Sequence, residues 1–388
     1  MQSRNISCRE RVLICLFAIL LAMFTNAASA QETSKTAASS PLQPPAATAP
    51  SAERSGPAGL GASSLPPGLD PKTMRPVYES IQEDWSSLDI GTSRLEPEPP
   101  LVAGNEEQET YTRTLVQVKW RPGDPIDLWV LLPKNVKKPP VVLYLYDTSW
   151  DTNRFRDPGW GARATSGGVA AVGFVSALSG HRFHDRPMTQ WFVSELQESV
   201  GSTVHDVKFI LDYLSQRGDV DMDRVGMFGQ GSGGAIAILS AAADSRIKAV
   251  DALDPWGDWP DFLAKSPLVL AAENHEQYVT PDFLKRVAPL DPVKWLPDLK
   301  ATLRIQQVHR ETTVPMECKD RIKAAAPNRA EVVRFEALAD LGMREGQGRL
   351  FEWIKNRVAQ PDRQRAAEVS VADKDGVKPP QAAASSPR

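Results

Sequence analysis

The stretch from Val225 to Leu239, VGMFGQGSGGAIAIL, has the outline of a turn that presents an attacking serine to an acyl carbon. An apolar run of strand length comes first, and small residues that suit a closely packed helix follow the glycines. In the motif G-x-S-x-G the central serine is the nucleophile, and the glycines permit a tight strand-to-helix turn. Gly229 and Gly233 match the two glycines of the motif, so the central position is Gly231, which has no side chain.

Ser232 lies one residue beyond that central position and is the nearest hydroxyl that could attack an acyl carbon. A motif centred on Ser232 would have Gln230 where its first glycine belongs. We therefore expect Ser232 to be a small turn residue or a helix cap. A nucleophile displaced to Ser232 is the open alternative.

The elements that must position this turn are strands and helices in alternation. Alternating patterns at 110–120 and 126–133, joined by the turn signal RPGDP, predict an antiparallel hairpin. Apolar runs then alternate with helical stretches, which predicts right-handed crossovers and a mostly parallel sheet. The expected strands are 141–146, 168–178, 224–229, 247–253, 303–308 and 331–338, and the expected helices are 75–88, 193–217, 233–244 and 348–360.

Two long segments make the pattern specific. Residues 206–255 contain the helix, the lead-in DVDMDRVG, the strand and the turn, and residues 288–315 run from APLDPVKW to HRETTVP. From about 111 to 359 the chain resembles the α/β-hydrolase superfamily, nearest its dienelactone-hydrolase and prolyl-oligopeptidase-like branch. The resemblance implies an α/β-hydrolase fold: a mostly parallel central sheet, an antiparallel N-terminal hairpin and a helical cap insertion at about 255–299.

The resemblance also implies where a serine–histidine–acid triad would lie. The nucleophile position is Gly231, and the histidine position in FEALADLG is Asp340. The acid position, four residues before Pro315, is Glu311. Asp254, which ends the expected strand 247–253, is a second candidate acid, with a turn or helix cap as its alternative role. The resemblance therefore implies a triad whose nucleophile and base positions are replaced.

The resemblance places the oxyanion-hole donors at Ser232 and Thr148. Asp147 precedes Thr148, and a carboxylate beside that hole would repel a developing oxyanion. This departure argues against acyl transfer as well.

The five histidines are His181, His184, His205, His275 and His309. The segment GHRFHDRP follows an expected strand at the edge where α/β sheets gather their sites, so His181 is a candidate base and the HRFHD loop a candidate metal site. Structural hydrogen bonding is the alternative for both. We expect His205 to be a partly exposed helix residue and His309 to end a strand.

The cap insertion is rich in large aromatic side chains. Trp256, Trp259 and Phe262 could line a pocket for an apolar or sugar-like ligand. The alternative is that these rings pack the cap against the core.

The chain of 388 residues divides by composition. Residues 1–30 have arginines, the apolar run VLICLFAILLAMF and then ASA, the order of a secretory signal peptide. Residues 31–74 are rich in Pro, Ala and Ser and predict a disordered tether. Residues 75–359 form one domain, and 360–388 a disordered tail. We therefore expect an exported protein, periplasmic or secreted, with no membrane association after signal cleavage.

Cysteine content and net charge argue against three features: an internal disulfide, a thiolate metal cluster and nucleic-acid binding. Cys8 and Cys15 fall within the signal peptide, so Cys318 alone leaves no internal disulfide and no thiolate cluster. The net charge of −3 becomes −5 without the three arginines and Glu10 of residues 1–30, which argues against nucleic-acid binding.

Together these observations predict a non-catalytic member of the superfamily that binds a small molecule or a peptide in the former active-site pocket, with no cofactor and no metal. One alternative is an active esterase or peptidase that uses Ser232 with His181, His184 or His309. A metal-assisted hydrolase at the HRFHD loop is the other.

Overall fold

The computed structural model describes residues 83–90, 95–121, 124–147, 152–177, 196–271 and 274–360. All of them belong to one compact unit, Ser64–Arg388. The predicted signal peptide, the predicted tether and nearly all of the predicted tail lie outside the described residues. In the part of the chain that the structure describes, no helix has both the length and the apolar character that a membrane span requires.

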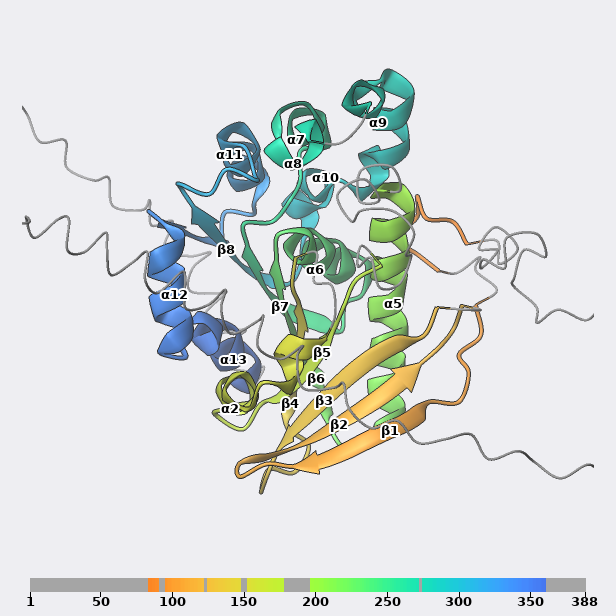
Figure 1. The fold of residues 1–388 in the computed structure, drawn as a ribbon, viewed down its shortest axis with the longest axis vertical. Helices are drawn as coiled ribbons and strands as arrows, with labels where there is room; N and C mark the ends of the chain where they lie inside the picture. Colours follow the sequence, from red (N-terminus) through yellow and green to blue (C-terminus); the bar gives the residue numbers. More distant parts are fainter. Residues whose placement is uncertain are drawn as a thin grey trace, which may run out of the picture. The chain divides into compact units, whose positions relative to one another are not determined.

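The described strands form a single sheet in the order β1-β2-β3-β5-β4-β6-β7-β8-β9 (Figure 1). β1, β2, β3 and β5 pair antiparallel in turn, and every other pairing is parallel. The predicted mostly parallel sheet with an antiparallel N-terminal hairpin is therefore confirmed. The strands are β1 Leu101–Glu107, β2 Tyr111–Val118, β3 Ile126–Pro133, β4 Pro140–Leu145, β5 Ala170–Phe174, β6 Asp221–Gln230, β7 Ile247–Leu253, β8 Thr302–Val308 and β9 Glu331–Phe335.

Helices cover both faces of this sheet, and β4 shows how the sequence produces the two layers. Its side chains alternate in direction: Val141 and Leu143 enter one hydrophobic cluster, whereas Val142 and Tyr144 enter the other. The continuous apolar run predicted at 141–146 is thus buried on both sides, as in parallel sheets generally.

The first cluster contains side chains from α5, α6, α11 and the segment between β7 and β8, and the second contains side chains from α2, α12 and α13. Figure 1 shows the short helices of the β7–β8 segment grouped together at the top of the view. The helices are α2 Pro158–Thr165, α5 Leu196–Arg217, α6 Ser232–Ala243, α7 Trp259–Lys265, α8 Pro267–Leu270, α9 Pro281–Val287, α10 Pro292–Trp295, α11 Met316–Ala325, α12 Leu338–Gly346 and α13 Glu352–Ala359. Short 3-10 helices lie at Asn153–Arg156, His275–Val279, Ala288–Leu290, Leu296–Asp298 and Arg349–Phe351.

Several local expectations were wrong. The helix expected at 75–88 is not helical in its described part, where only residues 85–86 form a turn. β1 was not predicted, because every one of its residues is exposed and its sequence therefore lacks the alternation of a half-buried strand. α12 begins where the strand expected at 331–338 was to end, and two of its side chains line the candidate site described below.

Candidate functional site

The turn between β6 and α6 has its tip at Gly231. This residue has φ 56° and ψ −117°, a conformation that only glycine adopts without strain, and α6 begins at the next residue. The flanking glycines allow close backbone contact: a Cβ on Gly229 would lie 2.1 Å from the Gly233 carbonyl oxygen, and a Cβ on Gly233 would lie 2.1 Å from the Leu145 carbonyl oxygen. The turn therefore has the backbone of a nucleophile turn, with no nucleophile at its tip.

Asp147 fills the space that a nucleophilic side chain would need. It follows β4, and a Cβ built on Gly231 would lie 2.6 Å from its Cγ and 2.7 Å from its Oδ2. These distances are well inside the roughly 3.5–4.0 Å at which heavy atoms attract each other. The amino end of α6 favours a negative charge there.

Ser232 is the first residue of α6 and is 1% exposed. Its Oγ donates a hydrogen bond to Asp147 Oδ1 at 3.1 Å. The hydroxyl is therefore bonded to a carboxylate rather than to an imidazole, and it helps to hold Asp147 at the turn.

The two candidate acids lie together and share one lysine. Lys319, on α11, is 1% exposed and its Nζ donates to the carbonyl oxygens of Val308 and Glu311 at 2.5 and 2.8 Å. The same Nζ lies 3.4 Å from Asp254 Oδ1. No sequence motif indicated Lys319, because its partners come from two other loops of the fold.

Asp254 is held tightly and is chemically perturbed. Its φ is +40°, it is 7% exposed, and its Oδ1 accepts a hydrogen bond from the Val308 N–H at 3.0 Å. Burial raises the pKa of Asp254 to about 6, while Lys319 and the Val308 N–H oppose that rise. Asp254 therefore changes charge in a range where the other carboxylates of an ordinary protein stay ionised.

Glu311 folds back on its own loop. Its Oε1 accepts a hydrogen bond from the Thr313 N–H at 2.8 Å, and its Oε2 lies 3.4 Å from the Val314 nitrogen. These bonds fix the carboxylate beside Asp254 without a histidine between them.

A cavity of about 190 Å³, here called the elbow cavity, joins these groups. It brings three carboxylates, one amide and several apolar side chains to one space. The lining residues are Asp147, Gln230, Leu253, Asp254, Trp256, Glu311, Thr313, Val314, Leu338 and Leu341.

Comparisons with known proteins decide the fold. No protein-family model and no curated protein matches the chain. The chain is similar in structure to an acetyl xylan esterase from Paenibacillus sp. R4, with a TM-score of 0.51, 17% identity, and 68% of this chain and 90% of that one covered. It is similar also to acetyl xylan esterase 1 from Thermoanaerobacterium sp. JW/SL YS485, with a TM-score of 0.50, 14% identity, and 67% and 89% covered. The chain has the α/β-hydrolase fold. At these identities the likeness carries the fold and no activity.

At the position where the α/β-hydrolase resemblance implies the catalytic histidine, the chain has a helix. Asp340 lies in the first turn of α12, and its Oδ2 accepts a hydrogen bond from the Ala337 N–H at 3.1 Å. Asp340 is thus a helix-capping residue, while Leu338 and Leu341 of the same helix line the elbow cavity. α12 places apolar side chains where the resemblance implies a base.

Among the described residues, no histidine lines the elbow cavity. His309 is exposed, and its backbone N–H donates to the Phe335 carbonyl oxygen. The expectation of a partly exposed His205 was wrong, because this residue is 1% exposed. His181, His184 and Thr148 lie outside the described residues. In the described part of the chain, no group of three or more His, Cys, Asp or Glu side chains could hold a metal ion.

The cap aromatics divide between the two roles that the sequence left open. Trp256 is 1% exposed and lines the elbow cavity. Trp259 and Phe262 do not line it: both are buried in the core, and the Trp259 Nε1–H donates to the Leu290 carbonyl oxygen at 3.0 Å. The rings of these two residues pack the cap against the domain, which is the alternative role that the sequence left open.

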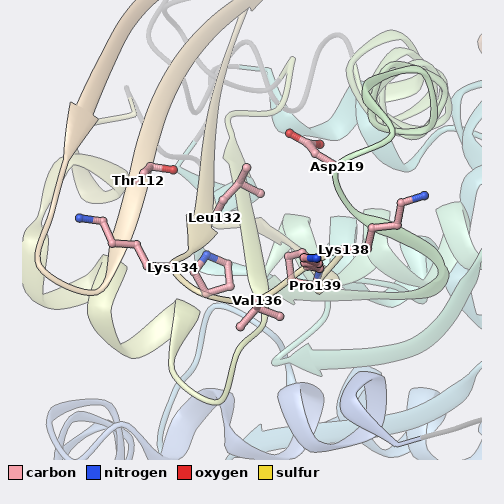
Figure 2. A pocket seen from close by; sticks show the side chains of 9 residues that line it. Thr112, Leu132, Lys134, Val136, Lys138, Pro139 and Asp219 are labelled. Atoms are coloured by element: carbon pink, nitrogen blue, oxygen red, sulfur yellow. The ribbon is translucent and has the colours of Figure 1, made fainter.

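A larger cavity, of about 610 Å³, lies beside the end of β3 and the start of β4 (Figure 2). Figure 2 shows Lys134 and Lys138 on either side of Leu132, Val136 and Pro139. No residue of the nucleophile turn or of the implied triad lines it. We place the candidate site at the smaller cavity, because the two candidate acids, Asp254 and Glu311, line it together with Asp147.

Proposed function

We propose that this chain is an exported protein with the α/β-hydrolase fold that binds a small molecule or a peptide in the elbow cavity and does not catalyse acyl transfer. The observation that carries the proposal is at the tip of the turn between β6 and α6, where Gly231 has no side chain and the Asp147 carboxylate fills the space in front of it. Export rests on the signal-peptide pattern of residues 1–30.

Serine catalysis needs a nucleophile and a base, and the implied positions offer neither. The Ser232 hydroxyl is bonded to Asp147, and the Asp340 carboxylate caps α12. A serine hydrolase without its catalytic residues retains only the acceleration from binding and oxyanion donors, about a thousandfold over water. We expect less here, because the Asp147 carboxylate opposes negative charge at that position.

The chemistry of the cavity favours a small ligand that donates hydrogen bonds. Its volume of about 190 Å³ is below the roughly 300–1,000 Å³ of sites for drug-sized molecules. Asp147, Asp254 and Glu311 supply acceptor oxygens, while Trp256 and Leu341 supply apolar surface. Such a lining favours an amine, a polyol or a peptide amino group over an anion.

Hydrolysis of short nitrophenyl esters tests the loss of catalysis. We expect residues 31–388 and the Ser232→Ala variant to show the same rate, at background. Gly231→Ser should also stay at background, because the new side chain would meet Asp147 and would have no base. Turnover by the parent that Ser232→Ala abolishes would show that Ser232 is the nucleophile and that the proposal is wrong.

Thermal unfolding tests the binding role. Putrescine serves as a cationic probe, xylose as a neutral polyol and acetate as an anionic comparison. A ligand at a hundred times its Kd stabilises the folded state by about 2.7 kcal/mol. We expect putrescine or xylose to raise Tm in the parent and in a Lys137→Gln control, but not in Glu311→Gln. A shift that is equal in all three proteins, or a shift with acetate alone, would contradict the assignment of the site.

A further inference from the structure

Residues 83–90, here called the docked segment, lie against α5. The backbone of the segment packs closely on the helix: a Cβ on Gly201 of α5 would lie 2.2 Å from the Trp85 carbonyl oxygen. Leu88 is 7% exposed and belongs to the hydrophobic core. At the surface, Lys208 of α5 pairs with Asp89 at 3.3 Å. The contact therefore has an apolar part, a close backbone approach and an ion pair.

The centre of this contact is the imidazole of His205, on α5. Its Nδ1 lies 2.6 Å from Glu83 Oε1, and its Nε2 lies 2.8 Å from the Ser87 carbonyl oxygen. Both ring nitrogens therefore face atoms of the docked segment. A carbonyl oxygen can only accept a hydrogen bond, and so can an ionised carboxylate.

Glu83 is ionised in this position. Burial alone would raise its pKa, but hydrogen bonds and charge from Arg121 and His205 lower that pKa to about 2. With an acceptor at each nitrogen, both nitrogens must carry a hydrogen, and the ring is an imidazolium.

The surrounding charges are consistent with a second cation. Glu83, Arg121, Asp124, His205 and Asp206 form what is here called the His205 cluster, and their side chains are at most 1% exposed. Three of them are carboxylates and one is a guanidinium, so a charged imidazole reduces the excess of negative charge. The other charged groups around the ring are at the surface: Asp84 from the docked segment and Lys208 with its partner Asp89.

We propose that His205 is a pH-sensitive clamp, which holds residues 83–90 on α5 while its ring is protonated and releases them when the ring loses a proton. The neutral ring has a single N–H, so either the Glu83 carboxylate or the Ser87 carbonyl loses its donor in a buried place. Leaving one buried acceptor unpaired shifts the opening equilibrium roughly ten- to a hundredfold. Residues 31–74, the predicted tether, precede the docked segment in the chain.

Amide hydrogen exchange of the full chain tests the clamp, with rates corrected for the intrinsic effect of pH. Between about pH 5 and pH 9, a range that brackets histidine titration, protection of residues 83–90 in the parent should fall roughly ten- to a hundredfold. Protection of the core strand β4 should stay constant. The His309→Gln control, at an exposed histidine, should behave as the parent, and His205→Gln should show low protection at every pH. Protection that does not change with pH in the parent would overturn the proposal.

Nitrogen NMR of the histidine rings supplies a readout that does not depend on a variant. At about pH 5 the His205 ring should show protons on both nitrogens while the segment is docked, and the loss of one proton should coincide with the loss of protection. A ring with a single N–H in the docked state would contradict the clamp.

Discussion

The elbow cavity and the His205 cluster each hold three carboxylates beside a buried cation, but the partners of these carboxylates differ. In the cluster, Arg121 bonds to Glu83 and Asp206, and the side chains are sealed from solvent. At the elbow cavity, the Lys319 ammonium pairs with the Asp254 carboxylate, whereas the Glu311 carboxylate accepts from backbone N–H groups. The cluster is therefore a closed ionic network, whereas the cavity leaves acceptor oxygens facing a space.

The difference separates charges that are matched within the fold from charges that a ligand can reach. A closed network contributes through partners that are already matched, and it fails when one of them is removed. A carboxylate that faces a cavity can instead accept a hydrogen bond from a ligand. The two regions should therefore respond differently to substitution and to pH.

The largest effect should follow the removal of the guanidinium from the cluster. We expect Arg121→Met to destabilise the domain by about 3–5 kcal/mol, because it removes the guanidinium that pairs with the buried carboxylates of Glu83 and Asp206. Urea unfolding measures the loss. Arg310→Met, which removes an exposed partner of Glu336, is the control and should change stability by less than about 0.5 kcal/mol. Similar losses of stability in both variants would show that Arg121 contributes no more to the fold than an exposed arginine does.

The second effect is the acid dependence of the cluster. The pKa of Glu83 falls from 4.5 to about 2 in the folded state, so its ionised form stabilises the fold. This stability is complete above about pH 4.5 and is lost as the pH falls toward 2, a loss of about 3 kcal/mol. Glu83→Gln should abolish that part of the pH dependence. Parallel curves for the parent and the variant would contradict the assignment.

The sequence predicts the features that arise from local patterns, and it misses those that depend on contacts between residues far apart in the chain. The apolar runs and the glycine frame predict the sheet and the tip at Gly231, because both patterns are local. The His205 cluster left no such trace: Arg121 and Asp206 are 85 positions apart, and Glu83 and His205 are 122 apart. The resemblance predicts a carboxylate of Asp147 beside the oxyanion hole, but not its close approach to Gly231, since a resemblance gives the position of a residue and not the direction of its side chain.

The third effect is the pH dependence of stability due to Asp254 at the elbow cavity, and its sign is opposite to that due to Glu83. Because burial raises the pKa of Asp254 to about 6, the folded state holds this proton more tightly than the unfolded chain. The domain should therefore lose up to about 3 kcal/mol as the pH rises from about 4 to about 6. Unfolding of Asp254→Asn should lack this change while keeping the acid dependence due to Glu83. A parent whose stability is level over this range would contradict the perturbed pKa.

The smallest effect tests the elbow tip itself. Gly231→Ser places a Cβ at a positive φ and against Asp147, so we expect a loss of about 1–3 kcal/mol and no esterase activity. Gly342→Ser is the matched control, since a Cβ at Gly342 of α12 meets nothing within 4 Å. Adding Asp147→Ala to Gly231→Ser should restore part of the stability, because it removes the atoms that the new side chain would contact. If the double variant is no more stable than Gly231→Ser, the strain comes from the backbone alone, and Asp147 does not fill the position of the nucleophile.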